Sequence, residues 1–122
     1  MTFSAESVVA GWESVDVVLS PIIGHKGVAA LFYRCVHLVL SDHPWLIRIQ
    51  ETQVRGSGLP FPSLRTVFAQ QSESEVAIAS RVLLGRFREQ LELLIGEPLT
   101  ERLLRSIWSD VFPDELLQGA SS

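Results

Sequence analysis

The sequence has one cysteine, no basic segment and no run of alternating polar and apolar residues. A single cysteine, Cys35, excludes an intrachain disulfide, which agrees with a reducing compartment. Because Cys35 lies in the apolar run 31–36, we interpret it as a small buried hydrophobe. Ten Lys and Arg against fourteen Asp and Glu give a net charge of −4, without the basic stripe that phosphate backbones require. We therefore expect no nucleic-acid partner.

The sequence also lacks a targeting or membrane-spanning signal. Its first residues have no basic start followed by a continuous apolar region, so no signal peptide is predicted. The most apolar stretch, 28–40, is interrupted by Arg34 and His37 and is too short to span a bilayer. We expect a cytoplasmic protein that does not bind membranes.

Signals for chemistry are equally scarce. The sequence has no nucleophile elbow, no phosphate-binding glycine loop, no dinucleotide fingerprint and no zinc-protease helix. Two metal ligands on one helix face need a spacing of about three or four residues. His37 and His43 are six residues apart, and Cys35 and His37 are two apart. We expect no catalytic residue, no metal and no cofactor, and thus not an enzyme.

Apolar residues, by contrast, are plentiful. They make up 47% of the 122 residues, with a mean hydropathy of +0.26. This length and composition predict a single folded domain over 1–122 and exclude a disordered chain. Two glycines and two prolines within 54–63 predict a loop there, and 119–122 is expected to be a flexible tail.

The spacing of the apolar residues predicts helices. From Ser4, apolar residues recur every three or four positions as far as Ile22, with a break or a new helix start expected at Ser20-Pro21. A further interruption is expected at Gly24-His25-Lys26-Gly27. The segment 28–40 is apolar almost all round, which is typical of the central helix of a bundle. Pro44 is expected to begin a short helix, with a short extended segment over 46–50 as the alternative, because the residues there alternate weakly. Pro62 is expected to begin another short helix.

The second half of the chain carries clearer helix signals. Ser72 and Glu75 have the spacing of a capping box, and Gly96 is a typical helix stop, so a helix is predicted between them. Its core face should include Val76 and Leu94. A last helix should follow from Pro98. Together these segments predict an all-α fold, a compact helical bundle of four main helices with one or two short helices.

Arg34 and His37 stand out because they lie three residues apart on an otherwise apolar helix, with Tyr33 adjacent. A buried Arg or His must be paired or hydrated. One interpretation is a pocket between helices in which Arg34, His37 and Tyr33 bind a small ligand. The other is a solvated edge of the bundle, or a bridge to Asp16 or Glu13 of the preceding helix.

Four large apolar residues are candidates for contact with a partner. Trp12 and Trp45 lie near apolar helix faces, and Leu59 and Phe61 lie in the predicted loop. Each ring is commonly a core anchor, but so many large side chains in a small bundle also favour a dimer seam. We therefore expect a protein partner, with a homodimer as the first expectation.

The string His25-Lys26-Gly27 in a small acidic helical protein resembles the phosphorylation motif of histidine phosphotransfer domains. The resemblance covers these three residues and the general size. It implies a helical bundle that carries a phosphoryl group on an exposed histidine, here His25. In that family the Lys-Gly pair follows the histidine by a couple of residues, whereas Lys26 is adjacent and points about 100° away.

These observations favour a non-enzymatic regulatory or protein–protein interaction module that associates with itself. The alternatives are a small-ligand or cofactor sensor with a pocket near Arg34 and His37, and a phosphotransfer domain of the signalling type.

Overall fold

The computed structural model describes residues 4–54 and 57–111, with side chains described as far as Arg105. Over these residues the fold is entirely helical, which confirms the predicted all-α bundle. The tail predicted at 119–122 lies outside the described residues. The elements are α1 (Ala5–Val39), the 3₁₀ helix η1 (Pro44–Leu46), α2 (Ile47–Gln50), α3 (Phe61–Ala69), α4 (Glu73–Ile95) and α5 (Glu97–Val111).

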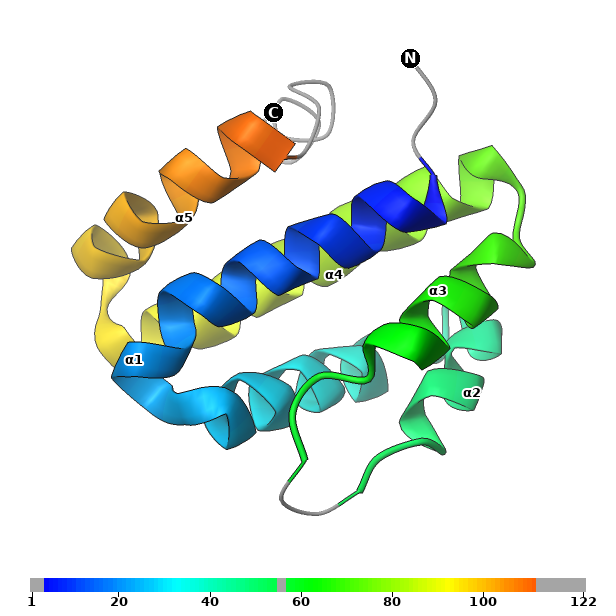
Figure 1. Ribbon diagram of the computed structural model, residues 1–122, viewed down its shortest axis with the longest axis horizontal. Coiled ribbons are helices and arrows are strands. Elements are labelled where there is room, and N and C mark those ends of the chain that lie inside the picture. Colours follow the sequence, from blue (N-terminus) through cyan, green and yellow to red (C-terminus); the bar gives the residue numbers. More distant parts are fainter. Residues whose placement is uncertain (1–3, 55–56, 112–122) are drawn as a thin grey trace.

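Helix α1 is bent into two arms, 5–23 and 25–39, at Gly24 (Figure 1). Gly24 has φ 80° and ψ 157°, a conformation that is essentially confined to glycine. The helix continues through Pro21, so no break occurs at Ser20-Pro21, and the bend at Gly24 lies within the interruption predicted at 24–27. Ile22, expected on the core face, is 46% exposed beside this bend.

Helix α1 is the centre of the bundle. It packs against α2, α3, α4 and α5, and its first arm lies alongside α4 in Figure 1. Val28, Phe32 and Val36 on the second arm are fully buried, as expected for a central helix. The ring of Trp12 on the first arm makes edge-to-face contacts with Phe32 and with Phe87 of α4, at centroid distances of 4.9 and 5.1 Å.

Helix α4 begins and ends where the sequence predicts. Its N-cap, Ser72, accepts a hydrogen bond from the backbone N–H of Glu75 at 3.1 Å. It ends at Gly96, whose φ of 93° favours glycine. The core face contains Val76 as predicted, but Leu94 is 60% exposed and does not belong to it.

By length and composition alone, α1 is apolar enough to cross a membrane, a test that the core helices of soluble proteins also meet. Only 28% of the apolar window that meets this test is buried within the chain.

Candidate functional site

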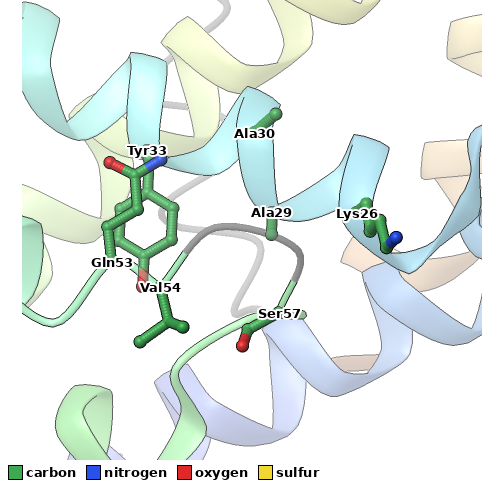
Figure 2. Close-up of a pocket in the computed structure, with 7 residues that line it drawn as sticks. All are labelled: Lys26, Ala29, Ala30, Tyr33, Gln53, Val54 and Ser57. Carbon is green, nitrogen blue, oxygen red and sulfur yellow. The ribbon is translucent and has the colours of Figure 1, made fainter.

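A pocket of about 510 Å³ lies between the second arm of α1 and the segment that follows α2 (Figure 2). This volume is within the range of small-molecule sites. Alanine side chains form part of its wall, and several polar groups surround them. The described lining residues are Lys26, Ala29, Ala30, Tyr33, Gln53, Val54 and Ser57.

The inner wall of this pocket is formed by buried residues of α1. Ala29 and Tyr33 are 3% and 4% exposed, so both belong to the packed core. The Thr52 hydroxyl donates to the backbone carbonyl of Ile49 at 2.6 Å. Its proton is thereby used, so the Tyr33 hydroxyl is the donor in the 3.4 Å contact between the two side chains. This contact fixes the phenol at the pocket wall.

Lys26 gives the pocket its charge. It is the only charged residue among the described residues that line the pocket, and the only lysine in the sequence. No described residue forms an ion pair with it. A protein of net charge −4 thus has a pocket whose described lining is cationic.

The sequence predicts a ligand site at Tyr33, Arg34 and His37, and the structure separates these residues. Tyr33 lines the pocket, but Arg34 and His37 do not. Both are exposed, and neither side chain makes a hydrogen bond or ion pair with another described residue, which is the arrangement of a solvated edge. Asp16, considered as their partner, is bonded by His25 instead.

His25 lies immediately after the bend of α1 and is bonded across it. Its Nδ1 lies 3.0 and 2.9 Å from the two carboxylate oxygens of Asp16. The His25 side chain is 68% exposed and that of Asp16 13%. Gly58 lies near the same histidine, since a Cβ placed on Gly58 would lie 3.9 Å from the His25 Cβ. The exposed position fits the resemblance, and phosphotransfer at His25 stays a prediction.

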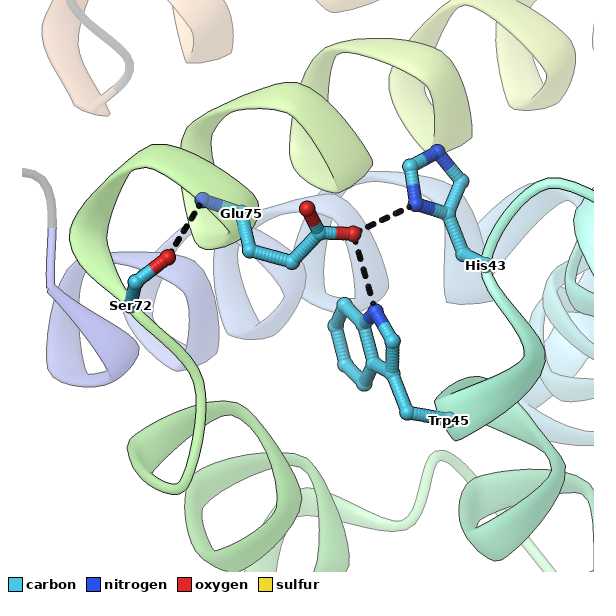
Figure 3. A network of polar contacts seen from close by, with 4 residues as sticks. All are labelled: His43, Trp45, Ser72 and Glu75. Atoms are coloured by element: carbon cyan, nitrogen blue, oxygen red, sulfur yellow. Dashed lines mark hydrogen bonds and ion pairs between the residues drawn. The ribbon is translucent and has the colours of Figure 1, made fainter.

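A second polar cluster joins the end of α1 to the start of α4 (Figure 3). Glu75 Oε1 lies 2.9 Å from His43 Nδ1 and accepts from Trp45 Nε1 at 3.0 Å. These two hydrogen bonds, Trp45 first, lower the pKa of the Glu75 carboxyl. His43 is only 6% exposed. We call His43, Trp45 and Glu75 the clasp. The sequence analysis missed it, because Glu75 was assigned to capping alone.

The four residues expected at a partner surface are mostly engaged within the chain. Trp12 and Leu59 are 1% and 8% exposed, so a partner cannot reach them on the folded chain. Phe61 is half-buried against the core. Trp45 is half-buried, with its ring edge-to-face on Phe68 at 5.1 Å. These side chains act as core anchors here.

Large apolar side chains are exposed at several other positions, Val17 and Val54 among them, and three lie close together in the sequence around Gly96. Leu93 and Leu94, in the last turn of α4, are 82% and 60% exposed, and Leu99, in the first turn of α5, is 38% exposed. We call these three residues the apolar corner. Leu94 carried a sequence signal, but its helical spacing indicated the core.

Cys35 is buried, and burial raises the pKa of its thiol to about 12. Among the described residues, no group of three or more His, Cys, Asp or Glu side chains is placed to hold a metal ion.

Comparison of the chain with protein-family models, with curated proteins and with solved structures finds no match.

Proposed function

We propose that the protein is a non-enzymatic interaction module that associates with a second copy of itself through the apolar corner. The observation that supports this is the exposure of Leu93, Leu94 and Leu99 on both sides of the Gly96 turn. Leucine side chains left in water cost free energy that burial against a partner recovers, at about 25 cal/mol per Å². Most soluble oligomers are symmetric, and two-fold dimers are the commonest.

The charge of the chain is compatible with such an association. Its net charge of −4 is small, so repulsion between two copies is weak at physiological ionic strength. The Arg105–Glu101 pair on α5, at 2.8 Å, and the Arg88–Glu92 pair on α4, at 3.0 Å, lie on the helices that carry the corner. Both pairs neutralise charge on these two helices.

Leu93→Glu tests this function. We expect the wild-type chain to be dimeric at tens of micromolar by size-exclusion chromatography with light scattering. The glutamate should weaken the dimer at least about tenfold, as expected for a contact residue of an interface. Because Leu93 is 82% exposed, the fold should not change, and circular dichroism checks this.

Val17→Glu is the matched control, since Val17 is also an exposed apolar residue on a helix, at 70%, but belongs to α1 and not to the apolar corner. It should leave the dimer intact. A wild-type chain that is monomeric at these concentrations would contradict self-association. Equal loss of the dimer in both variants would contradict the apolar corner as its surface.

A second candidate function is a small-ligand sensor, and the pocket beside Tyr33 favours it. The position differs from the one expected from the sequence, because Lys26 rather than Arg34 or His37 supplies the charge.

A further inference from the structure

We infer that the pocket beside Tyr33 binds a small organic carboxylate, with Lys26 as the group that pairs with the anion. This inference rests on the second candidate function, the small-ligand sensor, and names its class of ligand. It is independent of self-association through the apolar corner, which lies on α4 and α5.

The charge of the lining selects an anion. Lys26 is the only charged residue among those described in the lining, and no described carboxylate pairs with it. An ammonium group that has no protein partner can pair with a ligand carboxylate without first breaking an ion pair. A cationic ligand would meet Lys26 with no described acidic group in the lining to offset the repulsion.

The shape and polarity of the lining select an organic anion over an inorganic one. Ala30 and Val54 are exposed and offer apolar surface, and the pocket of about 510 Å³ is far larger than a phosphate or sulfate ion needs. In Figure 2, Lys26, Ala29 and Tyr33 lie along the second arm of α1, and Val54 and Ser57 lie on the segment that faces it. An apolar body against Ala30 and Val54, with its carboxylate toward Lys26, uses both kinds of surface.

The backbone beside Lys26 is anchored by the preceding residue. That residue, His25, is bonded to Asp16 across the bend of α1. The backbone at Lys26 is therefore anchored on one side by the first arm of α1. On the other side it faces the segment that contributes Ser57 to the lining.

The sole lysine makes this inference directly testable by chemistry. In the full chain, a water-soluble acylating reagent can modify two kinds of amine, the N-terminus and Lys26. Peptide mapping by mass spectrometry measures the two rates separately. We expect benzoate, the probe, to slow the acylation of Lys26 and leave the N-terminal amine unaffected.

Matched probes separate charge from shape. Benzoate and benzamide have nearly the same shape but differ in charge, and benzylamine carries the opposite charge. By titration calorimetry or chemical-shift changes, we expect a benzoate Kd on the order of 1 mM, typical of a fragment of this size. At equal ionic strength, benzamide and benzylamine should bind at least about fivefold more weakly, and inorganic phosphate should not protect Lys26.

Substitutions of lining residues test whether benzoate binds in this pocket. Lys26→Met should weaken benzoate about fivefold, whereas Lys26→Arg keeps the charge and should retain most of the affinity. Ala30→Leu places a larger side chain at the pocket wall and should also weaken benzoate. Ala10→Leu is its control, because Ala10 is exposed on the first arm of α1 and does not line the pocket.

The outcomes distinguish the inference from the function on which it rests. If benzamide or benzylamine binds as well as benzoate, or if Lys26→Met binds benzoate unchanged, the carboxylate class is wrong while a ligand pocket stands. Protection of Lys26 by phosphate as strong as by benzoate would likewise overturn the organic part of the inference. If none of the probes binds, both the inference and the sensor function fail.

Discussion

At the residue scale, Glu75 connects three parts of the chain. Its backbone N–H donates to Ser72 at the start of α4, and its Oε1 accepts from His43 and from Trp45. His43 follows the end of α1, and Trp45 lies in η1. A carboxylate that receives two hydrogen bonds is favoured in its ionised form. The clasp therefore couples the packing of α1 and η1 on α4 to the charge of one side chain.

Glu75→Gln tests this coupling. The folded chain lowers the pKa of Glu75, so the ionised carboxylate stabilises the fold at neutral pH. This stabilisation is lost as the pH falls from the ordinary range of a glutamate pKa through the lowered value in the folded chain. We expect Glu75→Gln to lower Tm at pH 7 and to have a diminishing effect as the pH falls through this range.

Glu73→Gln is the control for this measurement, because Glu73 also lies in the first turn of α4 but is exposed and does not contact the clasp. Both substitutions remove one favourable charge from the helix N-terminus. An equal change of Tm in the two variants at pH 7 would show that the clasp adds nothing to the dipole effect.

At the element scale, two glycines act differently within the bend of α1. Gly24 supplies the conformation, with φ 80°. Gly27 supplies space, because a Cβ at this position would lie 3.2 Å from the Cβ of Ile23. The bend lets both arms pack against the other helices without a separate loop.

Gly24→Ala should destabilise the protein. A Cβ at Gly24 would have no neighbour within 4 Å, so the penalty is one of backbone conformation, about 1 to 3 kcal/mol. Gly85→Ala is the comparison variant, and its expected effect on stability has the opposite sign. Gly85 is helical, inside α4, and equally open, so alanine should stabilise by about 0.5 to 1 kcal/mol.

Denaturant unfolding of the two variants beside the wild type measures both effects. The expected signs are opposite, which separates backbone conformation from any general effect of an added methyl group. A Gly24→Ala variant as stable as the wild type would show that the bend does not require this conformation.

The element scale also shows what the sequence could and could not reveal. The ends of α4 follow from local chemistry, since Ser72 satisfies a backbone N–H and Gly96 takes a positive φ. The bend of α1 has competing local signals at Pro21, Gly24 and Gly27. The choice among them depends on packing against α3, α4 and α5, which spacing alone does not contain.

The candidate site was less predictable for a related reason. Tyr33 was found because it lies beside two polar residues on an apolar helix. Its pocket, however, depends on the path of the segment carrying Gln53 and Ser57, which no periodic pattern fixes. The sequence analysis considered Lys26 only for phosphotransfer, because Lys26 lies next to His25.

At the scale of the whole molecule, the core is continuous through every long helix. The cluster of buried residues includes side chains from both arms of α1 and from α3, α4 and α5. Cys35 is fully buried in this cluster. A small continuous core of this kind is expected to unfold cooperatively.

Cys35 should report that cooperative unfolding. With a pKa of about 12, about one thiol in ten thousand is ionised at pH 8, and none of the side chain is exposed. We expect an aromatic disulfide reagent to react with one thiol per chain in denaturant. Under native conditions the reaction should be slow, and it should accelerate in variants such as Gly24→Ala in proportion to their loss of stability. Rapid reaction of the native wild-type chain would contradict a closed core.

The central position of α1 has a consequence during biosynthesis. Its principal neighbours in the bundle, α4, α3 and α5, all come later in the chain, so a ribosome finishes α1 before they exist. At about 5 to 20 residues per second, the nascent apolar helix waits several seconds for the surfaces that will cover it. During that interval it is a natural substrate for the chaperones that bind exposed apolar segments.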